Sequence, residues 1–255
     1  MEKNKIYFVS DFHFGLGDAR QEREKEDKAL RFLDFIEKDA CRLVLLGDIF
    51  DFWWEYKQVV PKGFVRFQAK LADLTSKGII VDYFAGNHDL WQKDYFATEL
   101  GVNIYRRKHQ AFELGGKTFV LGHGDGLDSK DYGYKIMDAV FSCRYLWWIF
   151  TSLPTSFAIG FARLWSRKNR DRHRKYDMQD KKTDEPMYRF CEQYLTKSHA
   201  DYFVFGHRHI KNEFVLSSGA KYINTGSWID DSPYAVFDMQ DLKLMKFEDN
   251  GALQN

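Results

Sequence analysis

Residues 79–89, IIVDYFAGNHD, join an apolar run to a glycine and three adjacent polar side chains, Asn87, His88 and Asp89. A short apolar run that ends in turn residues is typical of a buried strand. Glycine at its end permits a sharp turn and lets another group approach closely. A loop needs polar residues, but it does not need an amide, an imidazole and a carboxylate in succession. The stretch therefore predicts a strand that leads into a site.

Four further apolar runs end in a potential metal ligand or proton donor, three of them through glycine. The segments that follow them are Asp11-Phe12-His13, Gly47-Asp48, Gly122-His123 and Gly206-His207-Arg208-His209. In α/β sheets, ligands bind at the carboxyl ends of the strands. Side chains two residues apart on an extended segment point to the same side, so the paired donors of the first and last segments can converge. The five strand ends predict one shared site.

The order of elements indicates the fold class. Apolar runs at 5–10, 41–48 and 79–86 alternate with amphipathic helical patterns at 20–39 and 64–78, which predicts parallel βαβ units. The segment 111–125 reads as a hairpin around two glycines. The last third has short strands and tight turns, which we interpret as an antiparallel meander. We expect an α/β protein, a four-layer αββα sandwich of two packed mixed sheets flanked by helices.

The β pattern is interrupted in the middle of the chain. Helical patterns at 132–151, 156–167 and 186–197 replace it. We therefore expect a core of residues 1–127 and 198–255, with a helical lid, residues 128–197, inserted into it.

Composition limits the cellular setting and the partners. The net charge of +1 over 255 residues gives no overall attraction to nucleic acid, so none is expected as a partner. Three scattered cysteines, no secretory signal and no run of about 18 to 20 apolar residues predict a cytosolic protein with reduced thiols.

The strand ends carry an unusual number of metal-binding groups. A lone histidine is more often a core or surface residue, but five such strand ends in one chain favour a metal site. The donors are Asp11, His13, Asp48, Asn87, His123, His207 and His209. These are too many for one tetrahedral zinc, and they suit two divalent cations that share a carboxylate. Oxygen and imidazole donors fit Mn²⁺, Fe²⁺ or Zn²⁺. Two such ions can activate water and hold a phosphoryl group.

This series of motifs resembles the signature of the calcineurin-like metallophosphoesterases. The resemblance implies an αββα sandwich with a dinuclear centre. One metal is implied at Asp11, His13, Asp48 and His209, and the other at Asp48, Asn87, His123 and His207, with Asp48 bridging them. The same resemblance implies two catalytic residues: His88 as proton donor or stabiliser of the leaving group, and Asp89 as the group that orients its imidazole.

Several stretches are similar, more narrowly, to the bacterial UDP-2,3-diacylglucosamine hydrolases of lipid A biosynthesis. They are SDFHFG, LGDIFDFWWEY, GNHD, GHGDGL and the helical insertion. That family implies hydrolysis of the pyrophosphate to UMP and 2,3-diacylglucosamine 1-phosphate, with Mn²⁺ as the expected metal. It implies substrate contacts at Asn87, His88, Asp131, Ser166, Asn169 and His207. Many family members have arginine where this chain has His88.

The expected lid is aromatic at 145–165 and strongly basic at 166–175. Such a pair of segments suits an acyl-chain pocket at an anionic bilayer, so we expect peripheral association with the cytoplasmic face of the inner membrane. The alternative is a purely structural lid, which packs its aromatic side chains on the core and leaves its charged side chains in solvent. The aromatic stretch 50–56 either borders the site or forms a turn packed by tryptophans.

Two other functions compete with this reading. The chain could be a metallophosphoesterase for another nucleotide, a cyclic diester or DNA. A nuclease, however, would need a broad basic groove with stacking platforms. A non-catalytic scaffold on the same fold would be expected to lack some of the ligands, and all seven are present.

Overall fold

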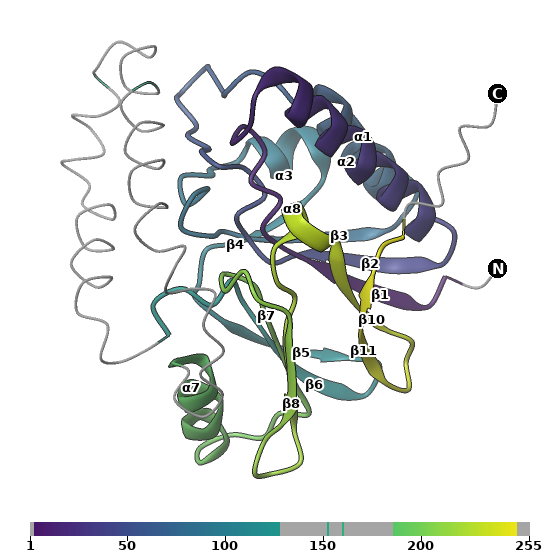
Figure 1. Ribbon diagram of the computed structural model, residues 1–255, viewed down its shortest axis with the longest axis vertical. Coiled ribbons are helices and arrows are strands. Elements are labelled where there is room, and N and C mark those ends of the chain that lie inside the picture. Colours follow the sequence, from purple (N-terminus) through teal and green to yellow (C-terminus); the bar gives the residue numbers. More distant parts are fainter. Residues whose placement is uncertain (1–2, 128–151, 153–159, 161–185, 249–255) are drawn as a thin grey trace.

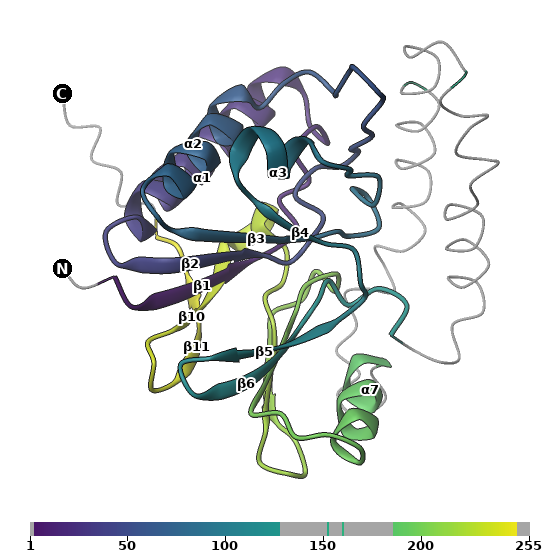
Figure 2. The ribbon, with the colours of Figure 1, turned by 180° about the vertical axis from the view of Figure 1, so that it is seen from behind.

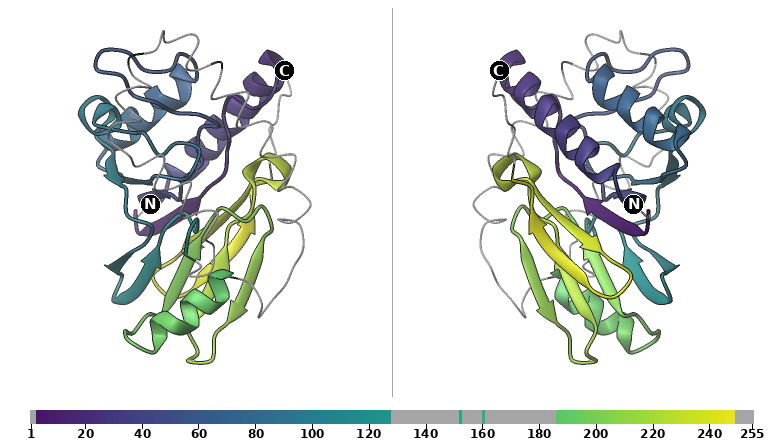
Figure 3. Two further views of the ribbon diagram at one scale, coloured as in Figure 1. Left: turned by 90° about the vertical axis from the view of Figure 1, so that its left-hand side faces the viewer. Right: turned by 90° about the vertical axis from the view of Figure 1, so that its right-hand side faces the viewer.

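Two packed sheets form the centre of the molecule, and helices lie outside them (Figure 1). The computed structural model describes residues 3–127, 152, 160 and 186–248. Figure 3 shows α1 and α7 on opposite sides of the two sheets. The order helix, sheet, sheet, helix confirms the predicted four-layer αββα sandwich.

The first sheet has six strands in the order β11-β10-β1-β2-β3-β4. Their bounds are β1 Lys5–Val9, β2 Ala40–Leu45, β3 Ile80–Phe84, β4 Asn103–Tyr105, β10 Pro233–Phe237 and β11 Leu242–Lys246. Strands β1 to β4 pair in parallel, as the βαβ pattern predicted, whereas β10 pairs antiparallel with both β1 and β11.

The second sheet has five strands in the order β5-β6-β7-β9-β8. Their bounds are β5 Gln110–Leu114, β6 Lys117–Leu121, β7 Tyr202–Phe205, β8 Asn212–Val215 and β9 Lys221–Asn224. The predicted hairpin is present as β5–β6. The predicted antiparallel meander is wrong in part, because β7 runs parallel to both β6 and β9. A helix precedes β7, and a helical crossover returns the chain in the same direction.

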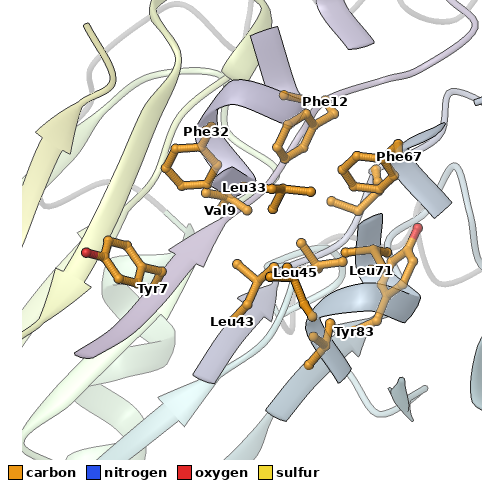
Figure 4. Close-up of a cluster of buried hydrophobic side chains, with 14 of the residues drawn as sticks. Tyr7, Val9, Phe12, Phe32, Leu33, Leu43, Leu45, Phe67, Leu71 and Tyr83 are labelled. Atoms are coloured by element: carbon orange, nitrogen blue, oxygen red, sulfur yellow. The ribbon is translucent and has the colours of Figure 1, made fainter. Parts of the chain in front are cut away.

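The main helices cover the first sheet (Figure 2), and their buried apolar residues pack against it. They are α1 Ala19–Ile36, α2 Val65–Ser76 and the shorter α3 Tyr95–Leu100. In α1 the N-cap Asp18 accepts the amides of Arg20 and Gln21, and Gln21 closes a capping box. Figure 4 shows the side chains of α1 and α2 against those of the first sheet, among them Phe32, Leu45 and Leu71.

The alternation of side chains along each strand builds the layers between the elements. Tyr7 and Val9 of β1 face the helices, whereas Phe8 packs between the sheets, where its ring stacks on Phe119 of β6 at 5.7 Å. This inter-sheet core fixes one sheet on the other. The carboxyl ends of their parallel strands consequently lie next to each other.

Helix α7, Pro186–Leu195, lies within the range that the sequence assigns to the lid. Its buried residues Met187 and Cys191 nevertheless pack with Phe203 and Phe205 on the outer face of the second sheet. This helix is therefore a layer of the core. The rest of the expected lid, except residues 152 and 160, lies outside the described residues.

Two short helices escaped sequence analysis, α3 and α8 Trp228–Asp231. They span six and four residues, too few for an apolar period to stand out. Within the described ranges, no helix is both long and apolar enough to cross a membrane.

Candidate metal centre

All seven predicted metal-binding side chains come together where the two sheets meet. The loops after β1, β2 and β3 supply Asp11, His13, Asp48 and Asn87, and the loops after β6 and β7 supply His123, His207 and His209. The site straddles the sandwich, so neither sheet could build it alone.

One group of donors is formed by Asp11, His13 and His209. The Nε2 atoms of the two histidines lie 3.2 Å apart, and Asp11 Oδ1 is 3.6 Å from the first and 3.5 Å from the second. Asp11 Oδ1 is buried and has no hydrogen-bond partner. An orphaned carboxylate oxygen facing two imidazole nitrogens is the environment that a divalent cation would satisfy.

The second group is formed by Asn87, His123 and His207 around the carboxylate of Asp48. Asn87 Oδ1 lies 3.3 Å from His123 Nε2 and 3.1 Å from His207 Nδ1. The Nε2 atom of His123 is also 3.3 Å from Asp48 Oδ2. An amide oxygen, a carboxylate and two imidazoles again fit a divalent cation.

Asp48 connects the two groups. Its Oδ2 atom lies 3.3 Å from His123 Nε2 in the second group and 3.8 Å from His13 Nε2 in the first. Its Oδ1 atom accepts the backbone N–H of His88 at 2.9 Å. A side chain at residue 86 would collide with Asp48, since a Cβ built on Gly86 meets both its carboxylate and its backbone nitrogen. Gly86, which follows the apolar run of the opening stretch, therefore makes room for this carboxylate.

Backbone strain is concentrated at the same residues. Asp11, His13, Asp48 and His207 have φ angles of 56°, 45°, 52° and 67°, in the left-handed region. Such conformations are unfavourable for residues other than glycine and persist where the surroundings hold them. Asp48 O accepts the amide of His13, and Asp11 Oδ2 accepts the amide of His207. The loops are thus held in strained conformations that aim their side chains at one another.

The charges of the site reinforce one another in the metal-free protein. Burial alone would raise the pKa of the Asp48 carboxyl, but His123 and the other imidazoles hold it well below its usual value. Burial alone would lower the pKa of His13, but the adjacent carboxylates of Asp11 and Asp51 raise it to about 10. For His207, burial and the charge of His123 lower the pKa to about 3. The positive charge of the protonated His13 imidazole therefore replaces part of the charge that bound cations would supply.

The imidazole of His88 lies at the edge of this centre. Its Nδ1 is 3.0 Å from the carbonyl oxygen of Asp51 and 3.7 Å from Oδ1 of the same residue, while Nε2 is 4.0 Å from Asp48 Oδ2. A carbonyl oxygen only accepts, so Nδ1 carries a hydrogen. Nε2 is then the ring nitrogen on the side of Asp48 and the metal-binding groups.

The prediction that Asp89 orients the His88 imidazole is wrong, because the Asp89 carboxylate bonds to other groups. The buried Asp89 carboxylate accepts hydrogen bonds from the Ile49 and Gly86 amides and from the Tyr83 hydroxyl. These donors fix the loops after β2 and β3 to each other. Asp51 holds the imidazole at Nδ1 instead.

Asp51 was missed by sequence analysis. Its Oδ1 lies 3.7 Å from Nδ1 of both His13 and His88, and its side chain is 5% exposed. The signal was its position three residues after Asp48, but sequence analysis considered the stretch 50–56 as a whole and did not single out its carboxylate.

The aromatic stretch 50–56 both packs and borders the site. Trp53 and Trp54 are buried, and the Trp53 indole donates to Glu55 at 3.0 Å. Several of its residues also line a small pocket that reaches Asp51. The pocket is lined by Phe14, Gly15, Phe50, Asp51, Phe52, Trp53, Pro61, Lys62 and Phe64. Of the predicted substrate contacts, Asp131, Ser166 and Asn169 lie outside the described residues.

Comparisons with known proteins agree with this geometry. A family model described as calcineurin-like phosphoesterase matches residues 4–211. The chain is 31% identical to a UDP-2,3-diacylglucosamine hydrolase of Porphyromonas gingivalis over 97% of this chain and 99% of that protein. It is 25% identical to a protein of the same name from Shewanella piezotolerans, over 91% of this chain and 96% of the relative.

Among solved structures, an archaeal phosphodiesterase aligns with a TM-score of 0.48 and 11% identity, over 95% of this chain and 99% of that one. The match of the family model spans the motifs from Asp11 to His209 that meet in the metal centre. The chain therefore belongs to the calcineurin-like phosphoesterase family.

Proposed function

We propose that this protein hydrolyses the pyrophosphate bond of UDP-2,3-diacylglucosamine and releases UMP and 2,3-diacylglucosamine 1-phosphate. The observation that carries the proposal is the position of Asp48 Oδ2 between two groups of metal-binding side chains. A pyrophosphate is cleaved by in-line displacement at phosphorus, which a pair of cations promotes from either side of a bridging ligand. The names of the relatives that match almost the whole chain support the choice of substrate.

In this proposal two divalent cations, most simply Mn²⁺, are held by the two donor groups. Asp11, His13, Asp48 and His209 would bind one, and Asp48, Asn87, His123 and His207 would bind the other. When bound, the cations would lower the pKa of the attacking water and offset negative charge on the phosphoryl oxygens. The oxygen and nitrogen donors also suit Fe²⁺ and Zn²⁺.

The protein's own side chains orient the substrate. Attack of water on the α-phosphorus breaks its bond to the bridging oxygen, which leaves with the sugar 1-phosphate. His88 Nε2, with its ring held through Nδ1 by Asp51, donates to that leaving oxygen. Asn87 and His207 are proposed to contact the phosphoryl oxygens, because both belong to the second donor group, where Asn87 Oδ1 lies 3.1 Å from His207 Nδ1. Asp131, Ser166 and Asn169 are proposed to contact the rest of the substrate from the lid.

The membrane is the proposed source of the substrate. A twice-acylated sugar resides in a bilayer, and the lid sequence pairs an aromatic segment, 145–165, with a basic one, 166–175. Such segments favour the surface of an anionic membrane. We therefore propose peripheral association with the cytoplasmic face of the inner membrane.

The decisive experiment is incubation of the purified protein with Mn²⁺ and UDP-2,3-diacylglucosamine in ¹⁸O-labelled water. We expect UMP carrying the label, because water attacks the α-phosphorus. UDP-glucose and a cyclic dinucleotide serve as comparison substrates, and an Asp48→Ala protein as the control for contaminating activity. Cleavage of the cyclic dinucleotide without release of UMP from the acylated substrate would refute the proposed substrate while retaining the reaction class.

A further inference from the structure

The turn that carries His13 is held by two side chains of α1. Glu22 accepts the backbone N–H groups of Gly15 at 2.7 Å and of Gly17 at 2.5 Å, one on each carboxylate oxygen. Lys25 donates to the carbonyl oxygen of His13 at 2.8 Å and pairs with Glu22 at 2.9 Å. The helix thereby grips residues 13–17, which we call the His13 turn.

Both charged groups are largely removed from water. The side chains of Glu22 and Lys25 are 11% and 12% exposed. Placing a carboxylate and an ammonium in such surroundings is unfavourable unless each is paired and hydrogen-bonded. Here the two charges pair with each other, and both side chains also bond to the backbone of the His13 turn.

The His13 turn needs such support because its backbone is strained. His13 has a φ of 45°, in the left-handed region that residues other than glycine rarely adopt. Its amide donates to Asp48 O at 3.0 Å, and its carbonyl accepts from Lys25. Fixing both peptide groups sets the direction of the imidazole, whose Nε2 faces Asp11 and His209.

We propose that Glu22 and Lys25 form a positioning pair for the cation bound by Asp11, His13 and His209. The inference rests on the proposed function, because it concerns the affinity of that metal centre. Without the pair, the strained turn relaxes and the His13 imidazole leaves the direction required by the cation. The turn supplies a ligand to this cation alone, because Asn87, His123 and His207 of the other group come from other loops. The loss is therefore selective for one of two sites.

The test compares two variants with a matched control. Lys25→Met removes the ammonium and keeps the aliphatic stem, and Glu22→Gln leaves one oxygen to accept where there were two. Lys70→Met is the control, because Lys70 is also mostly buried, at 15% exposure, but pairs with Asp34 and Glu37 between α1 and α2. Each full-length protein is freed of metal with a chelator and titrated with Mn²⁺, with binding followed by calorimetry and electron paramagnetic resonance.

We expect two binding events in the unsubstituted protein and in Lys70→Met. In Lys25→Met and Glu22→Gln one event should weaken by about 10- to 100-fold and the other should be unchanged, as is usual when a group that supports a metal ligand is lost. Circular dichroism of the metal-free proteins checks that they are folded. If Lys25→Met does not fold, Glu22→Gln alone carries the comparison.

The outcomes separate the two proposals. Wild-type affinities for both cations in the folded variants would refute the positioning pair and leave the proposed function intact. Equal weakening of both events would also refute it. That result is expected if the two side chains only stabilise the fold, because a general loss of stability affects both sites. Failure of the unsubstituted protein to bind Mn²⁺, Fe²⁺ or Zn²⁺ would refute the proposed function itself, and the positioning pair with it.

Discussion

Asp48 Oδ2 lies 3.3 Å from His123 Nε2, so a carboxylate from the first sheet meets an imidazole from the second. Replacement of Asp48 by alanine removes the one donor common to both groups. We expect turnover to fall by several orders of magnitude and both cations to bind more weakly, because neither group keeps its full set of ligands. Turnover and metal stoichiometry, by elemental analysis, measure the two effects.

Asp82→Asn is the control for that substitution. Asp82 is an equally buried carboxylate on the adjacent strand β3, where it pairs with Arg42 at 3.1 Å. Its loss should affect stability but leave two cations bound. Near-normal turnover of Asp48→Ala at a defined metal concentration would contradict the bridging role.

His88 and Asp51 should affect chemistry more than metal content. We expect His88→Gln to lower kcat by about 10²- to 10⁴-fold, the usual range for loss of a general acid, with little change in KM. Asp51→Asn keeps the main-chain carbonyl that holds Nδ1, so its effect should be smaller. Steady-state kinetics and elemental analysis of both variants test this division. Loss of one equivalent of metal from His88→Gln would show that the imidazole is a ligand.

Metal uptake should depend on pH with a definite sign. The pKa of His13 is raised to about 10 and that of His123 is raised as well, so both rings hold protons at neutral pH in the metal-free protein. A protonated imidazole cannot bind a cation, so uptake must release protons and affinity must rise with pH. We expect about a tenfold gain per pH unit for each proton displaced. Calorimetry at pH 7 in buffers of different ionisation enthalpy counts these protons, and buffer-independent heats would contradict the prediction.

Gly86→Ala should damage the site through Asp48. A Cβ at this position meets the Asp48 carboxylate and backbone nitrogen, which must move. We expect metal affinity to fall by about 10- to 100-fold. Gly78→Ala is the matched control, since Gly78 has a φ of 81° but nothing within 4 Å of its added Cβ. That change should cost about 1 kcal/mol of unfolding free energy through backbone strain alone and leave metal binding unchanged.

Much of the fold and the site followed from local sequence. An apolar run followed by glycine and a potential metal-binding side chain predicts both a strand and the site residue at its end. This pattern pointed to Asp48, Asn87 and His123. The pairing of β10 with β1 could not be foreseen, because their contact joins residues more than 220 positions apart, such as Phe8 and Ala235. Parallel and antiparallel neighbours have the same apolar patterns, so the meander was misread.

The errors at the site have a different cause. The packing of two loops against each other decides which residue orients a histidine ring. The order of residues within one loop does not. Asp89 follows His88 directly, yet its oxygens face the amides of Ile49 and Gly86. Asp51, from another strand end, reaches the ring. The left-handed conformation of Asp11 and its neighbours is likewise imposed by the assembled core.

The stacked rings of Phe8 and Phe119 lie between the sheets, in the apolar core that they share. They set the distance between the two sets of metal-binding side chains, because each set lies on the loops of a different sheet. A smaller side chain at either position would let the sheets settle closer or slide, and every ligand across the seam would shift together. The geometry of the candidate metal centre therefore depends in part on buried apolar residues in the core between the sheets.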